Sequence, residues 1–444
     1  MRQSQSPMRL SVKAFLCAAV AMAAANGAQA VTRPYLGMPH TAEGKMPALL
    51  SQTGAFRDTR SQTISDGLIP YDVAVPFWSD GADKSRWAAV PGEKIKFSPT
   101  GDWIFPAGTV FVKTFKLPVD AAHPTLKRLI ETRLLVRDST GGVYGVDYKW
   151  RPDHSDADLL QTSLTEDLEV KSASGAVVKQ TWYYPGRQDC LTCHNAKTSG
   201  VLGVKTRQLN HDFTYPSGAV DNELREWNRR GLFDRQLEEK DIASYPTLAA
   251  AGDASRSLQD RARSYLDANC SHCHRPGGTV AYFDARYDTP IEKQELIDGP
   301  VLLDQGIDRP RVIAPHDIWR SIAYMRMNTV SAIKMPPIGR ESIDVRGVAL
   351  LREWVVSLPG KPVLDPPVVS PPGGTFSGPV EVSLTEAEPG ADIRYTLDGS
   401  VPRTSDKPYT GPIKLDAPTV LRVRAFKDGY TRSITEQQVF IAGK

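Results

Sequence analysis

The stretch Tyr144-Gly145-Val146-Asp147-Tyr148-Lys149-Trp150 has a large apolar side chain at every second position, with a glycine or a charged residue between them. A period of two predicts a β-strand with one apolar and one polar face. Gly141-Gly142 precedes this stretch, and the largely aliphatic run Leu129–Val136 precedes the two glycines. Two such runs around a glycine pair predict an antiparallel hairpin. Because Thr109–Leu117 is a further β-rich run, we predict that residues 31–182 form an antiparallel β-domain of the sandwich type.

Four of the five cysteines belong to two copies of one pattern, Cys190-Leu191-Thr192-Cys193-His194 and Cys270-Ser271-His272-Cys273-His274. C-x-x-C-H is the attachment pattern of c-type haem. Its thiols form thioethers with the porphyrin vinyl groups, and the adjacent imidazole becomes an axial ligand of the iron. We therefore predict two covalently bound haem c groups. The cofactor-binding residues would be Cys190, Cys193, His194, Cys270, Cys273 and His274, with His194 and His274 as proximal ligands.

Two other uses of these cysteines stay open on the sequence alone. Four thiolates in C-x-x-C pairs can form one zinc site. Two local disulfides are also possible, because exported chains fold in an oxidising compartment. Neither alternative requires a histidine after each pair, so haem attachment explains more of the pattern.

The residues around the second motif have a helical pattern. Ser257-x-x-Asp260 is typical of a helix N-terminus, and apolar residues then recur with a helical period up to Cys270. A second helical stripe over Leu351–Leu358 ends at Pro359-Gly360, and Met335-Pro336-Pro337 lies between the two stripes.

This arrangement resembles the class I cytochrome c fold over roughly residues 250–360. The resemblance implies an α-helical cytochrome c domain over residues 249–360, with Met335 as the sixth ligand of the second iron. Met327 is the nearest alternative ligand. The other alternative is that Met335 only packs against its neighbours and binds no iron. A thioether opposite histidine raises the reduction potential.

The first motif has less regular surroundings, and residues 183–248 are predicted to be a haem-binding segment too small to fold alone. No methionine occurs between His194 and Met325. His211 is the tentative sixth ligand of the first iron. An open iron is another possibility, and so is a ligand from the N-terminal block, for which the candidates are His154, His123, Met38 and Met46.

The order of these parts resembles a family of exported bacterial dihaem c-type cytochromes over most of residues 45–360. The resemblance implies two haems and adds no substrate. The segments on which it rests are Trp78–Gly81, Gly108–Lys113, Cys190–His194, Gln208–Asn210, Cys270–His274 and Met335–Pro337.

The first thirty residues have the composition of a secretory signal peptide. Arg2, Arg9 and Lys13 precede or begin a short apolar run that ends at Ala28-Gln29-Ala30. We therefore expect a periplasmic or secreted protein without a transmembrane span after cleavage. These three basic residues account for the whole excess of 54 Lys+Arg over 51 Asp+Glu, so the charge gives no sign of a nucleic-acid partner. The fifth cysteine, Cys17, lies in the same segment.

The C-terminal part begins with a Pro-rich segment, residues 361–374, that we predict to be a linker. Residues 375–444 alternate like short strands and predict a small β-sandwich. Ile393–Pro402 and Ala425–Tyr430 resemble the C-terminal domain of chitobiases and β-hexosaminidases. The resemblance implies an immunoglobulin-like accessory unit without catalytic residues. Contact with carbohydrate or a cell-surface polymer is one role for it, and a structural or spacing role is the other.

The sequence thus predicts a multidomain chain with an N-terminal antiparallel β domain, an α-helical cytochrome c region and a C-terminal immunoglobulin-like β-sandwich. The predicted function is that of an exported dihaem c-type cytochrome transferring single electrons between redox partner proteins. One alternative is a dihaem oxidoreductase, peroxidase-like, with one open haem; another is a glycan- or surface-binding redox protein. No catalytic residue is predicted, because the common hydrolase, metalloprotease and nucleotide-binding motifs do not occur.

Overall fold

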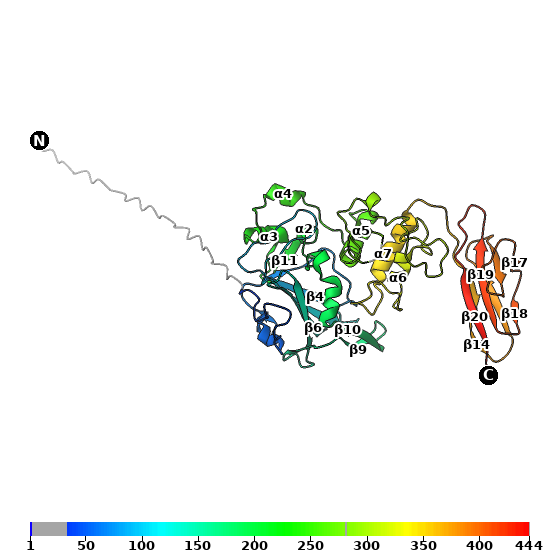
Figure 1. Cartoon of the computed structure of the whole chain (residues 1–444), viewed down its shortest axis with the longest axis horizontal. Helices are drawn as coiled ribbons and strands as arrows, with labels where there is room; N and C mark the ends of the chain where they lie inside the picture. The colour runs from blue at the N-terminus through cyan, green and yellow to red at the C-terminus, as the bar shows by residue number, and fades with distance from the viewer. Residues whose placement is uncertain (2–32, 280–281, 444) are drawn as a thin grey trace.

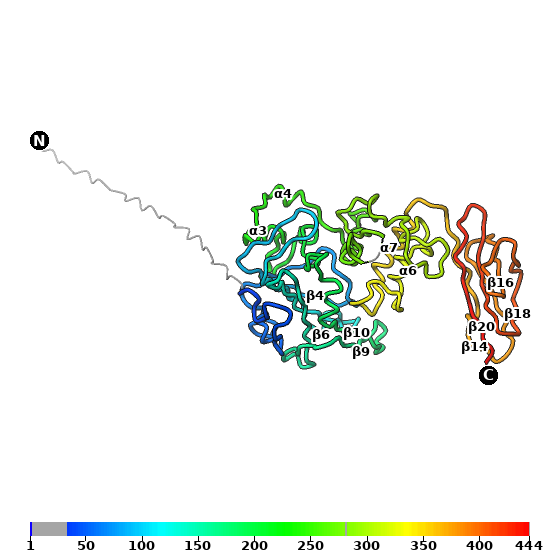
Figure 2. The backbone as a smooth tube through the Cα atoms, viewed as in Figure 1, coloured from blue at the N-terminus to red at the C-terminus, as the bar shows by residue number. Residues whose placement is uncertain are grey.

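The computed structural model describes Met1 and residues 33–279 and 282–443 (Figure 1). The predicted signal segment, apart from Met1, and Cys17 lie outside the described residues. Within the described ranges, none of the helices combines the length and the apolar character that a bilayer crossing requires. Figure 2 shows the N-terminal block, the region of the second motif and the C-terminal module following one another along the long axis of the molecule.

The N-terminal block is built on one six-stranded antiparallel sheet in the order β3-β4-β5-β6-β7-β8. Its strands are β3 (Ile69–Tyr71), β4 (Asp83–Ala89), β5 (Val110–Pro118), β6 (Lys127–Arg137), β7 (Val143–Trp150) and β8 (Ala157–Leu159). The β6–β7 hairpin turns at the glycine pair, where Gly141 has a φ of 88° that favours glycine. A separate two-stranded hairpin follows, β9 (Leu164–Lys171) with β10 (Val177–Tyr184).

One face of this sheet forms a core with the start of the chain. Tyr144, Val146, Tyr148 and Trp150 of β7 all lie in this core, together with residues of the segment 33–68. That segment contains only η1 (Leu50–Thr53) and the short strands β1 (Phe56–Asp58) and β2 (Thr63–Ile64). The strands β1 and β2 pair only with each other, in a two-stranded sheet too small to cover the six-stranded one, so the predicted two-sheet sandwich is wrong for this block.

The opposite face of the sheet packs against the segment of the first motif. Ile69, Tyr71 and Phe111 share a core there with Trp103 and Trp227. The elements of this segment are α1 (Arg187–Cys193), η2 (Ala196–Thr198), α2 (Thr206–Leu209), β11 (Asp212–Thr214), β12 (Val220–Asn222), α3 (Glu223–Arg229) and α4 (Glu239–Ser244). Because its apolar side chains are buried against the sheet, the segment belongs to the N-terminal block in packing terms.

The predicted α-helical cytochrome c region is wrong. In the described part of residues 249–360, the α-helices are α5 (Leu258–Cys270), α6 (Ile322–Met327) and α7 (Val345–Ser357), with 13, 6 and 13 residues. The single 3-10 turn described there is η3 (Ile291–Lys293). The rest is irregular chain, so the molecule as a whole is dominated by β-structure.

The physical reason lies in the sequence between α5 and α6. Prolines recur there at short intervals, and each one removes a backbone donor and disfavours helical conformation in the residue before it. They are Pro276, Pro290, Pro300, Pro310 and Pro315. Five non-glycine residues of the same stretch also adopt a positive φ, which no regular helix allows: Glu295, Asp298, Gln305, Arg309 and His316.

The helices α5 and α7 nevertheless pack against each other around one core. The hydroxyl of Tyr265 donates to Asp344 Oδ2 at 2.9 Å, just before α7 begins. A Cβ on Gly347 would lie 2.3 Å from the Tyr265 ring, so the close approach of the two helices depends on this glycine.

The C-terminal module consists of a three-stranded sheet, β13-β15-β18, and a five-stranded sheet, β14-β20-β19-β16-β17. The strands are β13 (Val368–Ser370), β14 (Gly374–Phe376), β15 (Val380–Thr385), β16 (Asp392–Thr396), β17 (Lys407–Pro408), β18 (Ile413–Leu415), β19 (Thr419–Phe426) and β20 (Glu436–Ala442). Val382, Leu421 and Val423 are fully buried between the sheets. The module lies at the end of the molecule farthest from the N-terminal block (Figure 1).

The Pro-rich segment 361–374 is ordered on the module rather than a free spacer. It contributes β13 and the start of β14. Backbone hydrogen bonds join Leu364 N to Thr431 O at 3.0 Å and Thr431 N to Pro362 O at 2.8 Å. The linker is thus packed against the hairpin that follows β19.

An ion cluster around Asp308 joins the module to the region of the second motif. The Asp308 carboxylate accepts Arg320 Nη2 at 3.0 Å and Arg432 Nη2 at 2.8 Å, and Arg424 Nη2 lies 3.3 Å away. The side chains of Arg320 and Arg424 are only 4% and 6% exposed. Burial alone would raise the pKa of Asp308, but Arg320, Arg432 and Arg424 outweigh it and hold the pKa below its ordinary value.

Replacing Asp308 should therefore weaken the junction. We expect Asp308→Asn to lower the free energy of unfolding by about 1.5–3 kcal/mol, because buried guanidinium groups lose their anionic acceptor. Chemical denaturation of the full chain measures this loss. The exposed Glu292 gives a matched control, Glu292→Gln, which should stay within about 0.5 kcal/mol of the parent. Equal stabilities of the two variants would contradict the role of Asp308.

The same cluster predicts a dependence on pH. Because the pKa of Asp308 is lower in the folded chain, its contribution to stability is fully present above the unfolded value of about 3.9. The contribution is lost as the pH falls through the lowered pKa. The stability difference between the parent and Asp308→Asn should therefore shrink in acid, and a constant difference would argue against this ion cluster.

Candidate functional site

The first motif is held on the sheet by close contact between α1 and β7. Gly145 is on the face of β7 opposite to the apolar core, and a Cβ there would lie 2.7 Å from Cys190 Sγ. The start of α1 is fixed by Asp189, whose Oδ2 accepts Gly186 N at 2.8 Å and the Tyr183 hydroxyl at 2.6 Å. Gly145 thus leaves the space in which the first motif packs on β7.

His194 is oriented as a neutral imidazole. Its Nδ1 lies 2.9 Å from the carbonyl oxygen of Gly200, which can only accept a hydrogen bond, so Nδ1 is the protonated nitrogen. Burial lowers the pKa of His194 to about 3. The ring therefore stays neutral near pH 7, and its Nε2 is left without a proton as a potential ligand atom.

The second motif follows directly from α5. Cys270 is the last residue of the helix, and His274 N donates to Cys270 O at 2.9 Å, which continues the helical turn. The His274 ring stacks on Phe283 at 4.2 Å between centroids. Burial lowers the pKa of His274 to about 4, and its Nδ1 is buried without a hydrogen-bond partner among the described residues.

The two motifs meet in space. The Sγ atoms of Cys193 and Cys273 and a ring nitrogen of His272 all lie within 4.8 Å of one another. The hydrogen bond from Cys193 lowers the pKa of the Cys273 thiol, and the same bond raises the pKa of Cys193. One cysteine of each motif, together with His272, thus forms one cluster.

Arg275, the residue after the second motif, ties this cluster together. Its Nη1 donates to Asp102 Oδ2 at 2.6 Å and to Lys197 O at 3.3 Å, and its Nε donates to Ser271 O at 2.7 Å. Lys197 follows the first motif and Asp102 belongs to the N-terminal block, so one guanidinium joins three separate segments.

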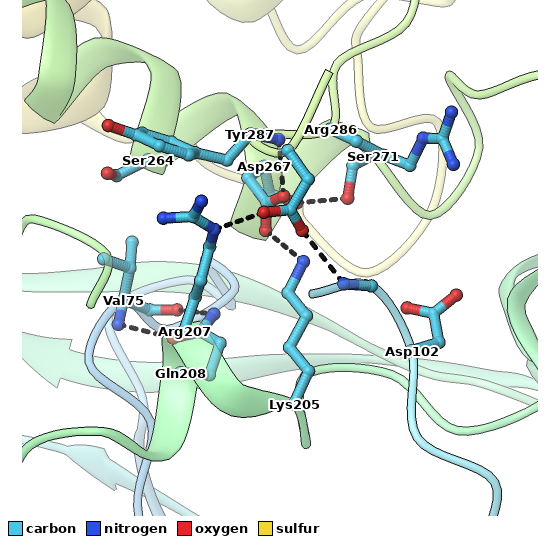
Figure 3. A network of polar contacts seen from close by, with 12 residues as sticks. Val75, Asp102, Lys205, Arg207, Gln208, Ser264, Asp267, Ser271, Arg286 and Tyr287 are labelled. Atoms are coloured by element: carbon cyan, nitrogen blue, oxygen red, sulfur yellow. Dashed lines mark hydrogen bonds and ion pairs between the residues drawn. The ribbon is translucent and has the colours of Figure 1, made fainter. Parts of the chain in front are cut away.

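A second set of polar contacts connects α5 to the segment of the first motif (Figure 3). Lys205 Nζ donates to Asp267 Oδ1 at 2.6 Å, and Asp267 Oδ2 accepts Tyr287 N at 2.9 Å. The Asp267 side chain is only 1% exposed. Arg207 pairs with Asp288 and stacks on the Tyr287 ring, 4.5 Å from its centroid. Fixed side chains on both segments therefore define how the two motifs approach.

The loop after β3 closes the same region. Trp78 N donates to Asn269 Oδ1 of α5 at 2.8 Å. Asp80 accepts Ser342 N at 2.7 Å and Glu341 N at 2.9 Å. Farther back in the loop, Val75 and Gln208 exchange two hydrogen bonds of 2.9 and 2.8 Å. This loop therefore binds both the segment of the first motif and the chain before α7.

A cavity of about 190 Å³ lies where these segments meet. Cys190, Cys193, His194 and His272 line it. Its apolar wall comes from the sheet, the loop after β3, the first-motif segment and the loop before α7, and includes Val75, Phe111, Phe115, Leu134, Val201 and Ile338. The cavity is thus lined by both cysteine motifs and by apolar side chains.

The cavity has a cationic side. Lys84, Arg86, Lys113 and Arg133 line it, against the single acidic lining residue Asp189. Arg86 pairs with Asp72, and Lys84 donates to the carbonyl of Phe77. The Lys113 ammonium makes no hydrogen bond or ion pair within the described part of the chain, although the charge of Glu131 acts on it. Burial, with Arg86 and Arg133 nearby, lowers the pKa of Lys113 to about 7. An anionic group in the cavity would relieve this repulsion.

The structure brings most of the predicted site residues together. Cys190, Cys193, His194 and Cys273 lie in or beside the cavity, and Cys270 packs in the core of α5 and α7. Met335 lies on a loop bound to the end of α6, because Met335 N donates to Arg326 O at 2.9 Å. The charge of Arg326 also contributes to the lowered pKa of His274, so this loop is near the second motif. Met335 as an iron ligand stays a prediction.

The other proposed sixth ligands of the first iron do not line the cavity. His211 Nε2 lies 3.5 Å from the buried Glu223, and its Nδ1 is 2.9 Å from Asp212 O. Met38 is buried in the first core of the N-terminal block, which Met46 also contacts. His123 is an exposed side chain that pairs with Asp120. His154 is likewise absent from the residues around the cavity.

Several functional candidates were not found from the sequence. Lys113 is embedded in a β-rich run, and Asp102 and Arg275 have no motif that marks them. Only His272 could have been noticed from the sequence, because it is an additional histidine between the two cysteines of a C-x-x-C pair. In the structure His272 lies beside Cys193 of the first motif, and the packing of α5 determines this contact.

One comparison with known proteins gives a match. The model of the chitobiase/beta-hexosaminidase C-terminal domain matches residues 371–437. This confirms the predicted resemblance of the C-terminal module, and it covers only that module. No curated protein matches the chain.

The contact between Gly145 and Cys190 can be tested by adding one methyl group. We expect Gly145→Ala to destabilise the chain by about 1–3 kcal/mol, because the new Cβ overlaps Cys190 Sγ and β7 and α1 must move apart. Denaturant unfolding measures the change. Gly92→Ala is the control, since a Cβ there meets no atom within 4 Å, and it should be nearly neutral. A neutral Gly145→Ala would mean that α1 is not seated on this strand.

Proposed function

We propose that this protein is an exported c-type cytochrome that binds two haem groups covalently and transfers single electrons between redox partner proteins. The observation that supports this most is the meeting of two C-x-x-C-H motifs, sulfur beside sulfur, at one partly cationic cavity. A zinc site or two structural disulfides would use the same cysteines. Neither alternative requires the cationic wall of the cavity.

The residues at the first motif fit a haem c group. Cys190 and Cys193 would form the thioethers, and the free Nε2 of His194 would ligate the iron. Gly145 leaves room for Cys190 on the sheet. Lys113 and Lys84 would face the propionates, whereas Arg86 and Arg133 already pair with Asp72 and Glu131.

The second motif offers a similar set of groups. Cys270 and Cys273 would form the thioethers, and His274 would be the proximal ligand, neutral at pH 7 because burial lowers its pKa. Phe283 fixes the plane of the His274 ring. Met335 is the proposed sixth ligand, on the loop whose Met335 N donates to Arg326 O near the end of α6.

When bound, haem iron supplies reversible one-electron chemistry, and the protein sets its ligands, burial and surroundings. The Sγ atoms of Cys193 and Cys273 lie within 4.8 Å of each other, so the two proposed attachment sites would adjoin. Electron exchange between two centres becomes faster as their edges approach. We therefore propose that the two sites exchange electrons inside the chain and that external partners need to reach only one of them.

This function predicts a fixed number of attached haems. A pyridine haemochrome assay on the purified exported protein should give two covalent haems per chain. We expect the double variant Cys190→Ala/Cys193→Ala to give one, and Cys270→Ala/Cys273→Ala to give one, because each pair serves one group. A parent protein with no covalent haem, and with Cys193–Cys273 or local disulfides in its mass spectrum, would overturn the proposal.

For the C-terminal module we propose a structural, spacing role. Residues 361–444 contain no tryptophan, and the module's Tyr395 is buried while Tyr430 is held by Glu388 and Lys427. Sugar rings generally stack on exposed aromatic faces, which these residues do not offer. The Asp308 cluster instead joins the module firmly to its neighbour.

Sedimentation with insoluble polysaccharide tests this role. The full-length holoprotein should stay in the supernatant with chitin and with cellulose, because Tyr395 is buried and Lys427 lies over the Tyr430 ring. An exported carbohydrate-binding protein is the positive control for the assay. Retention of the holoprotein on chitin, competed by soluble chitin fragments, would replace the structural role with contact to carbohydrate.

A further inference from the structure

We propose that His272, which lies between the two cysteines of the second motif, is the distal axial ligand of the iron held by the first motif. This inference rests on the proposed function, and it deepens it by giving the first iron two imidazole ligands. His194 would bind on one side and His272 on the other. One short segment, residues 270–274, would then provide groups to both haems.

The lining of the cavity leaves few other donors. His194 and His272 are the imidazoles among the residues that line it, and the same set contains no methionine. The Cys190 and Cys193 sulfurs are used by the thioethers. Lys84 is bound to the carbonyl of Phe77, and Lys113 faces Arg86 and Arg133, where an anion is favoured. His272 is therefore the nitrogen donor best suited to the iron.

The helical turn at the end of α5 directs His272 to this cavity. Ala268 and His272 both line it, and residues four apart lie on the same side of a helical turn. Cys270, between them in sequence, packs instead in the core that α5 forms with α7. His274 stacks on Phe283. The segment thus presents His272 to the first site and Cys270 to its own core.

The position of His272 is fixed from several directions. The Phe77 ring meets the imidazole edge-on, with 5.5 Å between centroids. Arg275 anchors the chain just beyond the motif to Asp102 and Lys197. His272 and His194 both line the same cavity. Two imidazoles near one another in the same cavity are the arrangement that a pair of axial ligands needs.

The present polar partner of His272 is the sulfur of Cys273. In the proposed holoprotein this sulfur is a thioether, which has no proton to donate and accepts only weakly. Attachment of the second haem would therefore release the His272 ring from Cys273. A buried imidazole without a partner is costly, and coordination of the first iron would satisfy it.

The test uses the full-length holoprotein with both haems attached. In the parent, electron paramagnetic resonance and near-infrared magnetic circular dichroism should show two low-spin irons, one of them with bis-imidazole ligation. We expect His272→Ala to keep two covalent haems and to convert one of the two irons to high spin. Added imidazole should return that iron to the low-spin state.

Thr192→Ala is the matched control, because Thr192 occupies in the first motif the position of His272 in the second and its side chain is exposed. Its spectra should equal those of the parent. If His272→Ala attaches fewer than two haems, the variant His272→Met tests the ligand role instead. Two covalent haems with one reduction potential raised would support that role, because thioether ligation raises the reduction potential. Unchanged potentials in that variant would overturn the role.

Two failures are distinguishable. A parent protein with fewer than two covalent haems would refute the proposed function itself. Two covalent haems in His272→Ala, both still low spin with unchanged near-infrared bands, would overturn only the assignment of His272. The cytochrome function would then stand with another distal ligand.

Discussion

The contact between the end of α5 and the sheet-bound first motif is the constraint on which the rest of the site depends. It places Cys273 and His272 beside Cys193, within 4.8 Å. Arg275, bound to Asp102 and Lys197, and Lys205, bound to Asp267, hold this contact from two sides. Without it the chain would have two separate cysteine motifs, and the cavity would lack one of its walls.

These connections are largely ionic and buried. Asp267 is 1% exposed and Lys205 10%. The attraction within a buried ion pair roughly repays the cost of desolvating it, so such pairs give little net stability. Removing one partner is costly, however, and misaligned segments would leave charges unpaired. We infer that these pairs fix the register of α5 on the first-motif segment, while the apolar cores supply most of the stability.

The sequence predicted some parts of the fold and missed others for physical reasons. The period of two in β7 correctly indicated a strand with one apolar face, because alternation is a local property of extended chain. The helical cytochrome c region was wrong, because the resemblance implied helical character for all of residues 249–360, whereas the proline-rich stretch between α5 and α6 is irregular. The sandwich predicted for the N-terminal block was wrong, because residues 33–68, which are largely irregular chain with two short strands, cover one face of its sheet.

The sequence by itself determined the chemistry of each motif. The spacing of Cys190, Cys193 and His194 is a matter of covalent geometry over five residues, and so is that of the second motif. Only the tertiary structure decided that the two motifs meet, that Lys113 lines a cavity with three other cationic side chains, and that His272 faces the cavity of the other motif while His211 does not. These relations join residues far apart in the chain, and they depend on how α5 packs against the N-terminal block, which no local pattern encodes.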